Sequence, residues 1–533
     1  MLLGMRGTLL AVLLFGACSG PNTNVSFGTH GSRERLCFAE SGDHAMKVLH
    51  ARPLRGGRSC GMLLDMRGVL LAILMFGACS GPDATIAPAG EQRPPNFVVV
   101  LADDLGYADV GFHGLRDFAT PNIDRLAAEG VRFTNAYVSH PYCSPSRAGL
   151  LTGRYQHRFG HVRNPKFRAG EGLPLSETLL PEVLSDAGYV SGIVGKWHLG
   201  DAPPFHPKER GFDEFFGLLG GGHDYFQSAG PDAREYLIPL EAHGEQIPVE
   251  GYLTEQLTAA ALDFIRRNAG HPFFLYLSYN APHGPLQAPP ELLERVNSIG
   301  DSRRQTYAAM VTSLDDGVGE VLGLLEELGM SEGTLVFFLS DNGGPTPANA
   351  SDNAPLRATK GTVYEGGVRV PFVMAWPSQL PAGSSYDPPV SSLDIFPTVV
   401  AAAGLETPAD LDGVNLMPYL AGTESSPPHE QLFWHSDEGG QFATRTAEHK
   451  LVRVLDREPE LYAIGEDISE SNPLKKDSGR SRALDGAIKA WHAAHPPPAW
   501  PGTRGERPVH PNTVKGLGAD QAEVDAWAAR QGK

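Results

Sequence analysis

The chain has 533 residues, a formal net charge of −18 at pH 7 and the composition of a globular protein. That length is enough for one large domain plus a smaller one. The negative charge argues against a nucleic-acid partner and favours small or neutral partners, although a few local cations can still bind an anion. The main body of the sequence contains no apolar run long enough for a helix that spans a membrane.

The N-terminus carries the same short segment twice. Residues 1–21 recur as residues 62–82 with four differences, and each copy is basic, then apolar, and ends in small residues and a cysteine. This pattern is typical of a secretory signal and is too short for an ordinary membrane span. Because two signals in tandem serve no purpose, we expect residues 1–61 to be a duplicated upstream fragment and the natural start to be Met62 or Met66.

The second copy ends in Phe-Gly-Ala-Cys79, which resembles the lipobox of bacterial lipoproteins with phenylalanine in place of the usual leucine. The resemblance implies a signal peptide over residues 62–79 and a lipid anchor on Cys79. It also implies export to the periplasm or cell surface of a bacterium. Residues 80–95, rich in Pro, Ala and Gly, would then form a flexible tether. Ordinary signal cleavage without a lipid is the alternative.

Strands and helices alternate from residue 96 onward. Residues 97–102 form a continuous apolar run, as expected for a strand buried on both faces of a parallel sheet. Thr120, a proline and a closing glycine delimit a helix over residues 120–130. Further strands are predicted over residues 190–194, 273–279, 335–340 and 368–376, and further helices over residues 253–267, 304–328 and 393–403. The alternation predicts an α/β fold with a large mixed, mostly parallel sheet flanked by helices.

A smaller α+β domain is predicted at the C-terminus, after a Pro-rich stretch that begins at Ser425. Residues 432–434 and 450–454 read as strands and residues 483–493 as a helix, which suggests a small sheet covered by a helix. We therefore divide the chain into a main domain over residues 96–424 and a C-terminal subdomain with a tail over residues 425–533. The tail from Pro496 is expected to wrap the surface or to line the functional cleft.

Oxygen-bearing side chains follow two of the predicted strands. Asp103 and Asp104 come directly after the first strand, and Asp341 and Asn342 follow the strand at 335–340. Parallel strands bring such residues to the same edge of a sheet. Clustered carboxylates repel one another unless a cation is present, and oxygen donors favour Ca²⁺ or Mg²⁺ over zinc. Each pair alone also fits a turn or a helix cap, whereas both pairs together favour a metal site.

Basic residues are predicted at the same edge. Lys196 and His198 follow the strand at 190–194, and residues two apart in an extended chain point the same way. His283 follows the strand at 273–279, and Lys360 lies in a Gly-rich loop before the strand at 368–376. His223 lies in a glycine-rich loop and is a further candidate for a substrate contact. Taken alone, each also fits an ordinary surface or loop residue.

One stretch carries a lone cysteine: Cys143-Ser-Pro-Ser-Arg147-Ala-Gly-Leu-Leu-Thr-Gly-Arg154. Beyond the leader, Cys143 is the only cysteine, so it has no intramolecular disulfide partner. Pro145 and Ser146 suit the first turn of a helix, which places Cys143 at a helix N-terminus, where an anion is favoured. Arg147 would point back toward the same spot. A buried, inert thiol is the alternative.

The stretch from Cys143 to Arg154 resembles the signature of type I sulfatases, of the alkaline phosphatase superfamily, in which a maturation enzyme oxidises the cysteine to formylglycine. The resemblance extends from about Asn96 into the C-terminal region. It implies a Ca²⁺ site, with Mg²⁺ as the alternative, and a set of catalytic and sulfate-binding residues. The implied metal ligands are Asp103, Asp104, Asp341, Asn342 and formylglycine from Cys143. The other implied catalytic positions are Arg147, Lys196, His198, His283 and Lys360.

The resemblance also implies a reaction, the hydrolysis of the sulfate ester of a sugar, a polysaccharide or another small molecule. One hydroxyl of the formylglycine gem-diol attacks sulfur with Asp341 as base, which forms a covalent sulfo-enzyme. Lys196, Lys360 and Arg147 would offset the charge on the sulfuryl group. His283 would protonate the leaving oxygen, and His198 would take the proton of the second hydroxyl. The alternatives are a phosphonate monoester or phosphodiester hydrolase of the same superfamily and an inactive carbohydrate-binding homologue.

Overall fold

The computed structural model describes residues 93–475, 478–501 and 509–531. The expected leader fragment at 1–61, the signal peptide at 62–79 with Cys79, and most of the tether at 80–95 lie outside the described residues and stay predictions. Among the helices of the described segments, none has both the length and the apolar character that crossing a bilayer requires.

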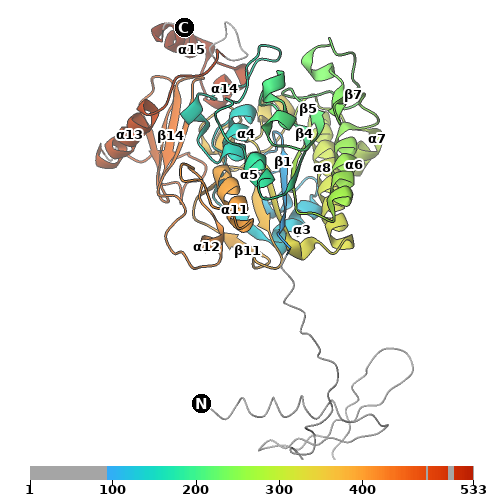
Figure 1. The fold of residues 1–533 in the computed structure, drawn as a ribbon. Helices are drawn as coiled ribbons and strands as arrows, with labels where there is room; N and C mark the ends of the chain where they lie inside the picture. The colour runs from blue at the N-terminus through green and yellow to red at the C-terminus, as the bar shows by residue number, and fades with distance from the viewer. Residues whose placement is uncertain (1–92, 476–477, 502–508, 532–533) are drawn as a thin grey trace, which may run out of the picture. The chain divides into compact units, whose positions relative to one another are not determined.

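A mixed, largely parallel sheet organises the described chain (Figure 1). In the part that the structure describes, this sheet has ten strands, in the order β11 (Ser384–Tyr386), β2 (Val131–Phe133), β10 (Phe372–Ala375), β9 (Thr334–Ser340), β1 (Asn96–Ala102), β8 (Phe273–Ser278), β4 (Val190–Lys196), β5 (Glu214–Leu218), β6 (Leu240–Ala242) and β7 (Glu245–Ile247). The central strands β9, β1, β8, β4 and β5 pair in parallel, whereas β10, β6 and β7 pair antiparallel. The predicted fold class is confirmed.

Helices cover both faces of this sheet because its central strands are apolar on both sides. In β1, Val98 and Val100 belong to one core and Phe97, Val99 and Leu101 to the other. The first core packs against α3 (Pro121–Glu129), α6 (Leu253–Asn268), α7 (Pro290–Arg295) and α8 (Ser302–Glu327). The second core packs against α4 (Cys143–Thr152), α5 (Leu180–Ser185) and α11 (Ile395–Ala402). Burial on both faces explains the unbroken apolar runs.

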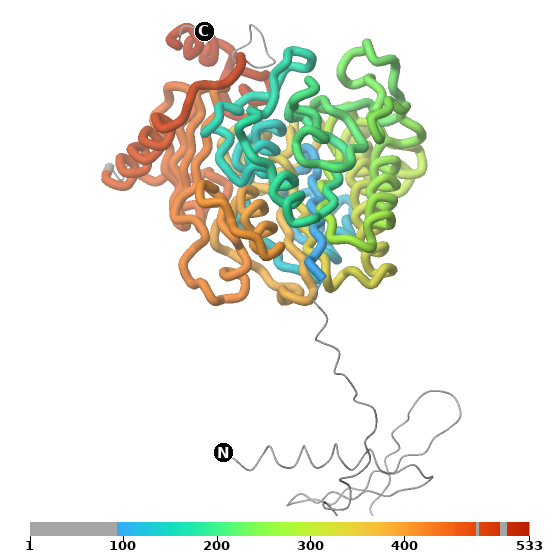
Figure 2. Tube along the Cα trace, viewed as in Figure 1, coloured from blue at the N-terminus to red at the C-terminus, as the bar shows by residue number. Residues whose placement is uncertain are grey.

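The C-terminal part, orange to red in Figure 2, has a sheet of its own. Among the described residues, this antiparallel sheet comprises β13 (Leu432–Ser436), β14 (Gln441–Arg445), β15 (Lys450–Arg453) and β16 (Glu460–Tyr462). Three further helices follow it: α13 (Ser478–Ala493), α14 (Pro511–Gly516) and α15 (Gln521–Arg530). The predicted small sheet with a helix is confirmed, while the boundary at Ser425 stays a prediction.

One strand boundary was predicted wrongly. The strand predicted over 368–376 is only β10, and the residues before it form the short helix α10 (Glu365–Val368). Pro371 has no backbone N–H to donate to a strand ladder, so pairing with β9 starts after it. The helix predicted over residues 120–130 is confirmed as α3, with Thr120 at the N-cap and Gly130 at the C-cap. The Thr120 hydroxyl accepts a hydrogen bond from the Gly111 N–H and makes no side-chain cap bond to the helix.

Candidate active site

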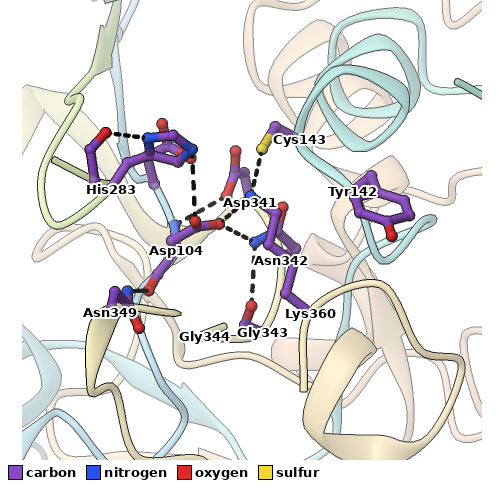
Figure 3. A network of polar contacts seen from close by, with 12 residues as sticks. Asp104, Tyr142, Cys143, His283, Asp341, Asn342, Gly343, Gly344, Asn349 and Lys360 are labelled. Carbon is purple, nitrogen blue, oxygen red and sulfur yellow. Dashed lines mark hydrogen bonds and ion pairs between the residues drawn. The ribbon is translucent and has the colours of Figure 1, made fainter. Parts of the chain in front are cut away.

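The acidic residues after β1 and β9 lie side by side. These strands pair in parallel with Ala102 opposite Ser340, so the chain leaves both at the same level of the sheet. Figure 3 shows the resulting cluster, in which the Asn342 side-chain amide donates to Asp104 Oδ1 at 2.6 Å. The Asp104 N–H donates to Asp341 Oδ1 at 3.3 Å. The structure thus brings together the four residues that the sequence places at strand ends.

Cys143 joins this cluster from the opposite side. It is the first residue of α4 and is buried, as the proline and serine after it suggested. Its Sγ atom and one carboxylate oxygen from each of Asp103, Asp104 and Asp341 all lie within 4.8 Å of one another. Lys360 Nζ donates to the same sulfur at 2.9 Å and also to Asp104. The predicted metal ligands therefore occupy one small volume.

The cluster fits a hard cation because it holds buried oxygen atoms that lack partners. Within the described ranges, Asp103 Oδ1 and Asn342 Oδ1 accept no hydrogen bond. A buried acceptor without a partner costs on the order of 1–3 kcal/mol, and three buried carboxylates repel one another. A cation with oxygen ligands would relieve both costs. Asp103, Asp104, Asp341 and Asn342 therefore suit Ca²⁺ or Mg²⁺.

Three basic side chains are distributed over the three carboxylates. Arg147 donates from Nε and Nη2 to Asp341 Oδ2 at 2.9 and 2.8 Å, and Lys196 Nζ donates to Asp103 Oδ2 at 2.6 Å. Lys360 pairs with Asp104, as described above. Arg147 also donates to the backbone carbonyl of Lys196 at 3.1 Å, which joins α4 to the end of β4. The basic residues thus surround the metal cluster.

Burial and these neighbours shift the pKa values of the site. Burial raises the pKa of the Cys143 thiol to about 12 even though Lys196 and Lys360 oppose the shift, so the free thiol is protonated at neutral pH. Burial alone would also raise the pKa of Asp103, but Lys196 is the first of the nearby cations that bring it below its ordinary value. Lys360 remains charged because the carboxylates, Asp104 above all, outweigh burial and raise its pKa well above the usual range.

The two predicted histidines flank the cluster. His198 does not continue the extended strand, since it has a left-handed φ of 62°, yet it still lines the pocket. Within the described residues its Nδ1 has no hydrogen-bond partner, and burial and then Lys196 lower its pKa well below the usual range. His283 Nε2 lies 3.6 Å from Asp104 Oδ2, while its Nδ1 contacts the Gly284 carbonyl oxygen at 2.8 Å.

His223 has a structural position. Both ring nitrogens contact backbone carbonyl oxygens, of Asp224 at 2.6 Å and of Ile238 at 2.5 Å. The residue is buried and lines a cavity separate from the pocket beside Cys143. The ring contacts therefore fit the structural alternative, a loop histidine, while a substrate contact by His223 stays a prediction.

A pocket of about 500 Å³ opens beside Cys143. The tail from Pro496 was expected to wrap the surface or to line the cleft, and its residues His510, Asn512 and Thr513 line this pocket. Other lining residues were not predicted from the sequence: Tyr142, Asn164, Glu235, Tyr236 and Asn349. Ser278, whose hydroxyl accepts a hydrogen bond from Arg147, was also missed. Because Ser278 ends β8, the strand-end rule that found Asp103 could have found it. The loop residues carry no comparable signal.

Comparisons with known proteins agree with this geometry. The sulfatase family model matches residues 95–405. The chain belongs to the sulfatase family. A second model, for the C-terminal region of N-sulphoglucosamine sulphohydrolase, matches residues 358–488. The protein is thus a sulfuric ester hydrolase, and its family generally uses Ca²⁺ and formylglycine.

Similar proteins include two human enzymes and one solved complex. N-acetylgalactosamine-6-sulfatase of Homo sapiens is 43% identical over 357 residues, which cover 62% of this chain and 67% of the relative. Arylsulfatase A of Homo sapiens is 40% identical over 396 residues, covering 69% of this chain and 76% of the relative. The structure of Ps i-CgsB in complex with k-i-k-neocarrahexaose has a TM-score of 0.73 and 37% identity, covering 82% of this chain and 98% of that one.

Proposed function

We propose that this sulfatase removes sulfate from sulfated glycans and that the reaction takes place at Cys143 after its conversion to formylglycine. The observation that carries the proposal is the packing of Cys143 against three carboxylates and Lys360 at the base of an open pocket. The aldehyde hydrate would supply two hydroxyl groups, one for each half of the reaction. A thiol would give a sulfur-linked ester without an easy route of release.

The side chains around Cys143 have positions that suit distinct tasks. Asp341 would accept the proton of the attacking hydroxyl, while Lys196, Lys360 and Arg147 would offset the charge of the transferring sulfuryl group. His198 is neutral at physiological pH, so it would take the proton of the second hydroxyl and release sulfate. His283 is part of the pocket wall and would protonate the leaving oxygen of the sugar.

The oxygen cluster would hold Ca²⁺, with Mg²⁺ as the alternative. Asp103, Asp104, Asp341 and Asn342 would be its ligands, together with the modified Cys143. When bound, the ion would act as a Lewis acid that offsets the negative charge of the sulfate ester and of the hydroxyl beside it.

The glycan part of the proposal rests on the pocket and on the relatives. Tyr236 and the side-chain amides in the pocket can contact a sugar ring and its hydroxyl groups. Ps i-CgsB, which has a similar fold, is known in complex with a neocarrahexaose. One human relative is named for a sulfated amino sugar.

Export as a lipoprotein is a separate proposal, which rests only on the sequence around Cys79. An extracellular location suits sulfated polysaccharides, which are too large to enter a cell. Mass spectrometry of the mature N-terminus would test it. A mature protein that retains Cys37 or Cys60 would contradict both the lipid anchor and the start at Met62.

The decisive test of the catalytic proposal is Cys143→Ala. The protein is produced with a formylglycine-generating enzyme, and peptide mass spectrometry establishes the aldehyde at Cys143 in the wild type. Sulfate release from a panel of singly sulfated sugars should fall at least about a thousandfold in the variant, since the nucleophile is lost. The thermal unfolding midpoint should stay close to that of the wild type.

Two outcomes would refute the proposal. One is near-native turnover by Cys143→Ala. The other is a wild-type protein that carries the aldehyde yet releases no sulfate from any member of the panel. Phosphonate and phosphate esters assayed in parallel would show in the second case whether the site acts on phosphorus instead.

A further inference from the structure

A C-terminal segment beyond both matched family models reaches the active pocket. The models end at residues 405 and 488, whereas His510, Asn512 and Thr513 line the pocket beside Cys143. These three residues lie at the start of α14, which Figure 1 labels near the C-terminus. Part of the pocket wall is therefore formed by residues that lie outside both family models.

The segment is attached to the element that carries Cys143. Thr513 Oγ1 shares a hydrogen bond of 2.8 Å with the hydroxyl of Tyr142, the residue directly before Cys143. The same hydroxyl donates to Glu438 Oε2 at 2.6 Å, and the His510 N–H donates to that carboxylate at 3.2 Å. The pocket-facing end of the segment is thus tied to the catalytic helix by side chains on both sides.

The segment also packs against the loop that carries Lys360. A Cβ atom placed on Gly361 would lie only 2.5 Å from Thr513 Oγ1, so the Thr513 side chain packs directly against the backbone of Gly361. A Cβ atom on Gly516 would lie 2.8 Å from Thr359 Cγ2. Val514, on the same helix, is buried in a small core with residues of α15. These contacts make the segment a well-defined wall of the pocket.

The chemistry of this wall suits an uncharged sugar. Asn512 lines the pocket, and among the described residues its side-chain amide makes no hydrogen bond. An amide can donate to and accept from sugar hydroxyls. Of the described residues that line the pocket, Lys360 is the only lysine or arginine, and Glu235 adds a carboxylate. Among these described lining residues, a second anionic group would meet the Glu235 carboxylate and no arginine or lysine besides Lys360.

We propose that Asn512 is a specificity-determining residue that hydrogen-bonds the hydroxyl groups of the uncharged sugar ring bearing the transferred sulfate. His510 positions it, because His510 Nδ1 accepts the Asn512 N–H at 3.1 Å and holds the turn into α14. The proposal rests on the proposed function, since it assumes a sulfated sugar at Cys143. Beyond that function, the proposal identifies the part of the chain that recognises the sugar ring.

The test compares Asn512→Ala with Lys515→Ala, an exposed substitution on the same helix outside the pocket. The probes are galactose 6-sulfate and N-acetylgalactosamine 6-sulfate as sugars, and 4-nitrophenyl sulfate as an ester without sugar hydroxyls. The measured quantity is the ratio of kcat/KM for the better sugar to kcat/KM for the aryl ester. Asn512→Ala should lower this ratio roughly tenfold, the upper end expected for one neutral hydrogen bond, and Lys515→Ala should keep it.

An unchanged ratio in Asn512→Ala would overturn the proposal, and so would an equal fall in both kcat/KM values. Thermal unfolding of both variants separates an unfolded sample from a change in recognition. Failure of the proposed function would look different, because the wild type itself would then release sulfate from neither kind of ester.

Discussion

Two clusters of buried charged side chains in this fold differ in their surroundings. In the catalytic centre, Asp103 Oδ1 and Asn342 Oδ1 accept no hydrogen bond from any described residue. In the second group, here called the Glu365 cluster, Glu365 and Glu470 share Lys450. Lys450 Nζ lies 2.8 Å from one carboxylate and 2.9 Å from the other. Both groups pair their carboxylates with basic side chains, and Glu470 Oε1 of the second group also accepts no hydrogen bond from a described residue. They differ in position, since the first group lies beside Cys143 and the pocket, whereas the two carboxylates of the second share one buried lysine.

The Glu365 cluster holds the loop that delivers Lys360. The Glu365 N–H donates to Glu470 Oε2 at 2.7 Å, and Arg357 donates to the Glu470 carbonyl oxygen at 3.1 Å. Residues on both sides of Lys360 are therefore attached to the small C-terminal sheet and the turn after it. The comparison separates two uses of buried charge, since the carboxylates beside Cys143 face a pocket and those of the Glu365 cluster hold a loop in position.

Removing the cation should have the largest effect on the catalytic centre. Dialysis against EDTA is expected to lower sulfate release at least about a hundredfold, because several kcal/mol of transition-state stabilisation are lost. Added Ca²⁺ should restore the activity, and parallel titration with Mg²⁺ tests which ion is preferred. Elemental analysis verifies removal, and full activity in metal-free protein would contradict the metal site.

Breaking the Glu365 cluster should instead act on stability. Lys450→Met leaves two buried carboxylates without their shared cation and should lower the free energy of unfolding by about 3–5 kcal/mol. Denaturant unfolding measures this loss. Arg295→Met, which removes the exposed ion pair with Asp316, is the matched control and should cost less than about 1 kcal/mol.

The enzyme assay separates Lys450→Met from the metal-free enzyme most clearly. Well below its unfolding midpoint, Lys450→Met should lose less activity than the metal-free enzyme, because no group that would contact sulfate has been removed. A loss of activity as large as that caused by EDTA, with unchanged stability, would show that the cluster belongs to the chemistry.

The smallest expected effect concerns pH. Burial raises the pKa of Glu470 to about 7, with Lys450 opposing the shift and the charge of Glu365 adding to it. A raised folded-state pKa stabilises the protein below the unfolded pKa of about 4.5, and this contribution is lost as the pH rises through about 7.

Glu470→Gln removes this proton exchange. Relative to the wild type, its unfolding free energy should be flatter between about pH 4.5 and 7, by on the order of 2 kcal/mol. Denaturant unfolding across that pH range measures the difference. Parallel pH profiles for the two proteins would contradict the assignment to Glu470.

Much of this architecture can be predicted from local signals. The central strands show as unbroken apolar runs because both of their faces are buried, and the residues directly after β1 and β9 lie together because parallel strands end at one edge. Cys143 could be placed at a helix start from the proline and serine that follow it.

Other parts depend on contacts that no local pattern encodes. The pairing of each carboxylate with a particular lysine or arginine is decided by packing between distant segments, as for Lys360 and Asp104. The turn at His198 replaces the extended chain that the sequence suggested. The tail was expected to wrap the surface or to line the cleft, but which of its residues reach the pocket depends on the packing of α14 against the Lys360 loop.

The burial of Cys143 has a consequence for the order of events during maturation. Only 1% of this residue is exposed, and the hydroxyl of Tyr142 beside it is hydrogen-bonded to Thr513 of the C-terminal segment. If Cys143 is converted to formylglycine as proposed, the oxidising enzyme would need the sulfur within its own active site and would therefore act on a chain that has not yet closed over this helix. The C-terminal segment is synthesised long after Cys143, which leaves an interval for the modification. Chains that fold completely before they meet the oxidising enzyme would keep an inaccessible thiol.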